Sequence, residues 1–182
     1  MQRVRSGDHI FIGSGCAEPQ NLVRALAENE GVVEGEILHI LTLGIAPYAD
    51  PRFPSRFRHN ALFIGANVRE AVHAGLADYT PIFLSEIPGL FRSGRLGIDA
   101  ALITVSPPDR AGYVSLGISV DVVRSAVAAA DVVLAEVNAA MPRTHGDSFV
   151  HVSEIDAFVE CDTPLLELPQ PEPDPLSREI AR

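Results

Sequence analysis

A short apolar run at residues 99–105 narrows the possible folds of this chain more than any other stretch. Its side chains are almost all aliphatic, which is the pattern of a strand buried on both faces of a parallel sheet. A loop at residues 106–117 follows, with two adjacent prolines, Pro107 and Pro108, and two glycines. Because ligands of open α/β sheets bind at the carboxyl ends of strands, we expect this loop to belong to a ligand site.

Strand, turn and helix patterns alternate along the chain. Pro19 suits the first turn of the first helix, and Asn67 is placed to cap the helix after the third strand. His9 and His39 are expected to be hydrogen-bonded strand residues. The alternation predicts an α/β fold, a mostly parallel sheet with helices on both faces, within one domain of residues 1–168. The strands are expected at residues 9–12, 37–43, 61–64, 80–84, 99–105 and 131–137. Residues 149–152, a short helical turn at 153–157 and residues 165–168 are expected to finish the fold.

Composition argues against several classes of function. A formal net charge of -10 disfavours a nucleic-acid partner, because neutralising phosphates requires a basic surface. All 14 basic residues are arginine, which excludes a Schiff-base lysine and a phosphate-loop lysine. The cysteines, Cys16 and Cys161, are too few for a disulfide scaffold, and no apolar run approaches the ~20 residues of a membrane span. We therefore expect a cytoplasmic protein with no membrane partner.

The end of the chain differs in composition from the rest. Residues 169–175 carry proline at every second position, which is typical of a stiff, extended spacer. The last residues, 176–182, have the pattern of the first turns of a helix. We expect residues 169–182 to be a linker and the start of a C-terminal domain.

Three local patterns allow more than one interpretation. The Gly13-Ser14-Gly15 turn resembles the start of a dinucleotide fingerprint, but Glu18 stands where the third glycine belongs and would repel a pyrophosphate. Cys16, near a helix start, is either an activated thiol or a small residue packed under the turn, and packing is favoured. No histidine has the spacing of a metal ligand, so no metal is expected.

An arginine cluster precedes the third expected strand. Arg52, Arg56 and Arg58, followed by His59, form either a solvated loop or a site for an anion such as a nucleotide phosphate. The solvated loop is the favoured interpretation.

Three ordered motifs, at residues 13–19, 106–117 and 141–156, resemble the N-terminal domain of the acetyl-CoA hydrolase/transferase family. This class I CoA-transferase group includes 4-hydroxybutyrate CoA-transferases. The resemblance implies a CoA-transferase-like open sandwich and ping-pong transfer of CoA between carboxylic acids through a glutamyl-CoA thioester. It implies CoA and acyl-CoA as substrates, small carboxylates as acceptors and no tightly bound cofactor.

The family nucleophile is a glutamate in a glycine-rich motif of the C-terminal domain. No Glu-x-Gly-x-Gly sequence occurs in the 182 residues, so we expect the nucleophile beyond Arg182 and no activity without a C-terminal domain. The chain would form one wall of the active site, and because relatives often form dimers a homodimer stays open. The expected substrate-binding residues are Gly13, Ser14, Gly15, Cys16, Glu18, Pro19, Ser106, Pro107, Asp109, Gly112, Asn138, Met141 and Pro142.

Among these residues, the backbone N–H groups of Gly13, Gly15 and Gly112 and the side chain of Asn138 are candidate donors to substrate oxygens. Two other functions remain open from the residues alone. One is a domain of related α/β fold that binds a phosphorylated metabolite without catalysis. The other is a nicotinamide-dependent enzyme, which Glu18 already disfavours.

Overall fold

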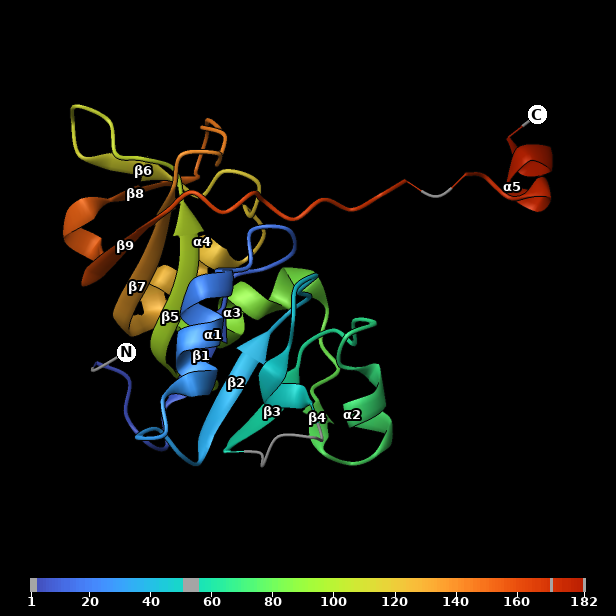
Figure 1. The fold of residues 1–182 in the computed structure, drawn as a ribbon, viewed down its shortest axis with the longest axis horizontal. Coiled ribbons are helices and arrows are strands. Elements are labelled where there is room, and N and C mark those ends of the chain that lie inside the picture. The colour runs from blue at the N-terminus through green and yellow to red at the C-terminus, as the bar shows by residue number, and fades with distance from the viewer. Residues whose placement is uncertain (1–2, 51–55, 171, 182) are drawn as a thin grey trace.

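A computed structural model describes residues 3–50, 56–170 and 172–181 of the chain. Its main element is a seven-stranded sheet in the order β4-β3-β2-β1-β5-β7-β9, in which every neighbouring pair is parallel (Figure 1). The α/β prediction is therefore confirmed. The strands of this sheet are β1 (His9–Ile12), β2 (Gly35–His39), β3 (Phe57–Ala61), β4 (Ala77–Tyr79), β5 (Ile98–Val105), β7 (Ala130–Asn138) and β9 (Ala157–Cys161).

Helices lie on both faces of the sheet. Figure 1 shows α1 (Gln20–Glu28) in front of β1 and the pair α3 (Ile87–Arg92) and α4 (Val123–Ala129) behind it. The 3-10 turn η1 (Pro47–Ala49) packs beside α1, and η2 (Leu84–Glu86) leads into α3. The helix α2 (Arg69–His73) precedes the edge strand β4.

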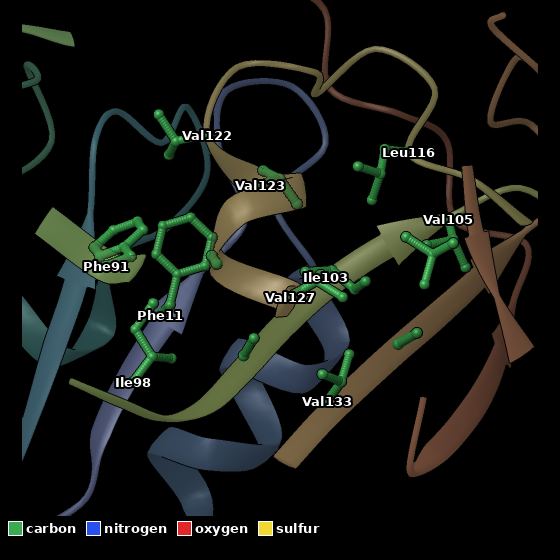
Figure 2. Close-up of a cluster of buried hydrophobic side chains, with 14 of the residues drawn as sticks. Phe11, Phe91, Ile98, Ile103, Val105, Leu116, Val122, Val123, Val127 and Val133 are labelled. Atoms are coloured by element: carbon green, nitrogen blue, oxygen red, sulfur yellow. The ribbon is translucent and has the colours of Figure 1, made fainter. Parts of the chain in front are cut away.

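The side chains of the central strands alternate between two hydrophobic cores, as the period of two in a strand requires. From β1, Ile10 and Ile12 point into the core under α1, whereas Phe11 points into the core under α3 and α4. Figure 2 shows this second core, where the rings of Phe11 and Phe91 meet edge to face with centroids 5.7 Å apart.

The strand order reverses direction between β1 and β5, because the chain builds outward from β1 to β4 and then returns to the other side of β1. Such a switch point is where open α/β sheets bind ligands. Gly13 follows β1 there, and a Cβ on it would lie 3.3 Å from the carbonyl oxygen of Leu102 in β5. The glycine thus lets the two strands approach each other at this point.

Three predicted strands are misplaced. β3 begins four residues before the strand expected at 61–64, and β4 begins three residues before the strand expected at 80–84. β2 begins and ends earlier than the expected 37–43. For β3 the reason is that it carries polar side chains, which bond to the neighbouring strands: Arg58 to Asp78, and Asn60 to Glu36.

The carboxyl end of the molecule holds further elements. Within the loop after β5, β6 (Tyr113–Ser115) pairs antiparallel with β8 (Phe149–His151), and the 3-10 turn η3 (Val152–Glu154) precedes β9. β8 lies within the expected segment 149–152, whereas β6 and β9 were not expected and the segment expected at 165–168 has no regular structure.

The tail of the chain has little regular structure. Residues 162–170 and 172–174 have none, and the tail runs away from the sheet to the exposed helix α5 (Pro175–Ile180) in Figure 1. Arg182, beyond which the nucleophile is expected, lies outside the described residues. Among the helices of the described ranges, none is long and apolar enough to cross a bilayer.

Candidate active-site wall

Two turns at the carboxyl ends of β1 and β2 are bound to each other. The N–H of Gly15 donates to the carbonyl of Leu41 at 2.6 Å, and Gly15 forms an isolated parallel bridge with Thr42. The carboxylate of Glu18 accepts from the N–H of Gly44 at 2.7 Å. We call residues 13–19 the first turn and residues 42–46 the second turn.

Asn67 braces the second turn from the opposite side. It does not cap α2, as the sequence analysis expected: Val68 is the residue before the helix, and no side chain caps it. The amide of Asn67 instead donates to Oγ1 of Thr42 at 3.0 Å and to the carbonyl of Gly44 at 3.1 Å. A short polar side chain can bond either its own backbone or a neighbouring loop, and here the loop is the partner.

The loops after β5 and β7 form a second bound pair. The hydroxyl of Thr144 donates to the carbonyl of Gly117 at 2.9 Å, and the N–H of Thr144 donates to Oγ of Ser115 at 3.1 Å. Arg143 pairs with the carboxylate of Asp109 at 2.5 Å, across the two loops. The expected site residues of the 106–117 and 138–147 loops therefore belong to one structural unit.

Met141 packs against Gly117 inside this unit. Gly117 has a φ of +61°, which favours glycine, and a Cβ on it would lie 2.1 Å from the sulfur of Met141. Met141 itself is buried. This contact explains why a glycine ends the loop.

Ser119 links the two pairs of loops. Its hydroxyl donates to the carbonyl of Ser14 at 3.1 Å, so the loop after β5 is tied to the first turn. The tertiary structure thus gathers the expected site segments along one edge of the sheet, on either side of the switch point.

The four candidate donors already make hydrogen bonds within this domain. The N–H of Gly13 donates to Leu102 at 2.8 Å, that of Gly15 to Leu41, and that of Gly112 to Asp109 at 3.0 Å. The amide of Asn138 donates to the carbonyl of Thr163 at 2.7 Å. A substrate oxygen would have to displace or share these bonds, so the donor role of the four groups stays a prediction.

The expected site residues divide by exposure. The buried members are Gly13, Ser14, Glu18, Pro19, Ser106, Asn138 and Met141. The members that reach the surface, fully or in part, are Gly15, Cys16, Pro107, Asp109, Gly112 and Pro142.

Glu136 is a buried carboxylate at the end of β7. It accepts from the N–H of Leu22 at 2.6 Å and from the amide of Asn21 at 3.2 Å, so it binds the first turn of α1. Negative charge at the start of a helix stabilises it. The thiol of Cys161 lies 3.5 Å from the same carboxylate, and burial together with the charge of Glu136 raises the pKa of Cys161.

Glu18 lies in a different environment, although it is also buried. Burial raises its pKa from 4.5 to about 7, the N–H of Gly44 opposes this rise, and the charge of Glu136 adds to it. Its second oxygen, Oε1, has no hydrogen-bond partner among the described residues. Burial also raises the pKa of Tyr48, and the nearby Glu18 carboxylate contributes to this rise.

His39 and His59 stack on each other, with ring centroids 4.2 Å apart, and Tyr48 packs against both rings. Burial lowers the pKa of His39 well below 6.5 and that of His59 to about 4, so both rings are neutral near pH 7. Their ring nitrogens have no hydrogen-bond partner in the described part of the chain, so the expectation of a hydrogen-bonded His39 is wrong. His9 does bond, to Asp99 at 3.1 Å.

In the described ranges, the arginines of the cluster bind separate partners. Arg56 donates to the carbonyls of Ala27 and Asn29 at the end of α1, and Arg58 pairs with Asp78 at 2.5 Å. Arg52 lies outside the described residues. Over residues 3–50, 56–170 and 172–181, no three His, Cys, Asp or Glu side chains gather as a metal site.

Sequence reasoning missed the residues that join the loops. These are Thr42 and Gly44 of the second turn, and Ser115, Ser119 and Thr144 of the other pair. Short polar residues next to glycines in strand-end loops were the available signal, but their partners lie 25 to 105 residues away in the sequence.

Comparison with known proteins identifies the family. A family model for the acetyl-CoA hydrolase/transferase N-terminal domain matches residues 1–167. The chain belongs to this family. It is 46% identical over 94% of its length to the 4-hydroxybutyrate coenzyme A transferase of Clostridium kluyveri. It is 41% identical over 92% of its length to a succinyl-CoA:acetate/propanoyl-CoA:succinate CoA transferase of Fasciola hepatica.

A solved family structure supports the fold and the resemblance found in the sequence. RipA from Yersinia pestis superposes with a TM-score of 0.84 at 29% identity, over 94% of this chain and 43% of RipA. The chain covers 40% of the Clostridium protein and 36% of the Fasciola protein. It therefore spans about two fifths of the length of these acetyl-CoA hydrolase/transferase family members.

Proposed function

We propose that this chain forms one wall of the active site of an enzyme that moves CoA between carboxylic acids. The observation that carries the proposal is the 46% identity to a 4-hydroxybutyrate coenzyme A transferase across 94% of the chain. We propose that this wall is formed by the linked loops at the switch point, where open α/β sheets bind ligands. Residues 1–168 are the domain, and residues 169–182 lead toward a second domain that closes the site.

The proposed reaction begins when a glutamate carboxylate attacks the thioester carbonyl of acyl-CoA. The C–S bond breaks, CoA departs as the thiolate, and an acyl-glutamyl anhydride is formed. The thiolate then attacks the glutamyl carbonyl, which releases the first carboxylic acid and forms a glutamyl-CoA thioester. An acceptor carboxylate reverses these steps, whereas water in its place gives hydrolysis.

The nucleophile is proposed to lie beyond Arg182, outside this chain. The two buried carboxylates at the sheet edge, Glu18 and Glu136, bind Gly44 and Leu22 within the domain. Each is at most 4% exposed, which leaves little access for a thioester.

The proposed contacts to substrate lie at the surface of the linked loops. They are the side chains of Cys16, Pro107 and Pro142, together with the backbone around Gly15 and Gly112. These positions are among the expected site residues that the fold leaves accessible, fully or in part.

The test measures acetyl-CoA turnover by the purified chain, with and without a carboxylate acceptor, and adds borohydride to trap an enzyme thioester. We expect no turnover and no trapped residue with this chain alone. Fusion to the remaining length of the Clostridium kluyveri relative should restore turnover and borohydride inactivation. Turnover by the chain alone that Glu136→Gln abolishes would place the nucleophile within it and overturn the proposal.

Ligand-dependent thermal shifts separate the alternative functions. CoA or acetyl-CoA should raise the melting temperature of the fusion protein, while a sugar phosphate and NAD should not. A shift with a sugar phosphate alone would support a non-catalytic metabolite-binding domain.

A further inference from the structure

We propose that Glu18 is a positioning residue that holds the second turn, residues 42–46, against the first turn, residues 13–19. The inference rests on the proposed function in one respect only, namely that the two turns belong to the wall that contacts acyl-CoA. The contacts themselves involve the chain alone.

Glu18 and Gly44 fit each other closely. Oε2 of Glu18 accepts from the Gly44 N–H at 2.7 Å, and a Cβ on Gly44 would lie 2.6 Å from Oε2 and 2.8 Å from Cδ. Gly44 does not have a positive φ, so its backbone would tolerate another residue. The carboxylate is therefore what restricts position 44 to glycine.

The second turn is held from two further directions. Asn67 bonds both Thr42 and the carbonyl of Gly44, and Gly15 of the first turn bonds Leu41. The next residue, Ile45, is 52% exposed. Because Gly44 is fixed by Glu18, the carboxylate also sets the position of the next residue, Ile45, whose side chain lines a pocket with Arg24 and Ala27 of α1.

The surroundings of Glu18 make its bond sensitive to pH. The ionisable groups that face it are Glu136 from β7 and Tyr48 from η1, and no ion pair to an arginine is present among the described residues. Burial raises the pKa of Glu18 to about 7. A hydrogen bond to an ionised carboxylate is stronger and shorter than one to its neutral form, so the Gly44 amide reports the protonation of Glu18.

The first test follows the Gly44 amide resonance of the ¹⁵N-labelled chain from pH 5 to 9. In the unmodified chain the resonance should titrate with a midpoint near pH 7, and in Glu18→Gln it should stay constant. Glu136→Gln is the matched control, in which the titration should persist with a lower midpoint because a repelling charge is gone. A flat profile in the unmodified chain, or the same titration in Glu18→Gln, would overturn the proposal.

The second test is a double-mutant cycle on melting temperature. Gly44→Ala should lower the melting temperature more when position 18 is glutamate than in the Glu18→Ala background, where the side chain that it meets is absent. Additive effects would contradict the proposal. Neither measurement involves acyl-CoA, so a failure of CoA transfer leaves both outcomes unchanged, and a failure here leaves the proposed function untouched.

Discussion

On the α3 and α4 face the sheet packs against hydrocarbon side chains. On the α1 face the core also encloses polar atoms that have no hydrogen-bond partner among the described residues. The first core is built from residues such as Phe11, Phe91 and Ile103 (Figure 2). On that side, the one polar atom buried without a hydrogen bond among the described residues is Nη1 of Arg124, and it forms an ion pair with Glu154 at 3.2 Å.

The α1 face holds the remaining buried polar atoms without partners. Four of the side chains lie at the carboxyl ends of strands or in the first turn, namely Ser14, Glu18, His39 and Thr104, and the other two are Tyr48 in η1 and His59 in the middle of β3. Burying a polar group without a hydrogen bond costs stability, so the α1 face combines a hydrophobic core with buried polar groups that lower stability, beside the proposed site. Such a division is expected where function opposes stability.

The largest expected effect is on the hydrocarbon face. Phe11→Ala should lower the free energy of unfolding by about 3–5 kcal/mol, because it leaves a cavity next to Phe91. Urea denaturation measures this loss. The control is Phe83→Ala, at a side chain 77% exposed, which should change stability by less than about 0.5 kcal/mol. Similar losses in both variants would mean that this core is not the source of stability.

The pH dependence of stability sharpens the contrast on the polar face. Folding raises the pKa of Glu18 from 4.5 to about 7, so its contribution to stability is lost as pH rises through this window. Folding lowers the pKa of His59 from 6.5 to about 4, so its contribution is lost as pH falls through that window. The two effects oppose each other between pH 4.5 and 6.5, and each amounts to at most ~3 kcal/mol.

Single variants should separate these opposing contributions. Between pH 6.5 and 4.5, the slope of the unfolding free energy against pH reflects the protons taken up on unfolding. Glu18→Gln should increase this uptake by about one proton, so that acidification costs more stability, and His59→Phe should decrease it by a similar amount. Unfolding free energies in urea at several pH values measure both slopes. Unchanged slopes in either variant would show that the group does not titrate as its burial implies.

Glu136→Ala should have a smaller effect, a loss of about 1–3 kcal/mol, because the N–H of Leu22 at the start of α1 loses its acceptor. Urea denaturation again measures the loss. Glu160→Ala, at an exposed position on β9, is the control and should be nearly neutral. Equal effects would argue against the role of Glu136 as the anchor of α1.

The smallest expected effect compares two threonines. Thr104→Val should be neutral or stabilising by up to about 1 kcal/mol, because the Thr104 hydroxyl is buried without a partner in the described structure. Thr144→Val should lose about 1 kcal/mol, because that hydroxyl donates to Gly117. Thermal unfolding compares them. A clear loss in Thr104→Val would reveal a partner for this hydroxyl.

Apolar periodicity was sufficient for the central strands and insufficient for the strands toward the β4 side of the sheet. β1, β5 and β7 were predicted within one residue at each end, because strands buried on both faces consist of short aliphatic runs. β3 was misplaced because Arg58 and Asn60 interrupt its apolar pattern. Their partners, Asp78 and Glu36, are contributed by neighbouring strands, and a local pattern does not reveal them.

The amino-acid sequence alone was enough to establish the α/β class, the central strands and the family, because all of these depend on local pattern or on continuous motifs, whereas the segments at the proposed site stay a prediction. Only the tertiary structure showed that the glycine N–H donors are already hydrogen-bonded and that Glu18 accepts a hydrogen bond from Gly44. It also showed that the ring nitrogens of two buried histidines have no hydrogen-bond partners among the described residues. The physical reason is that hydrogen bonding and desolvation depend on groups brought together from distant parts of the chain. Glu18 and Gly44, 26 residues apart, meet only because β1 and β2 lie side by side in the sheet.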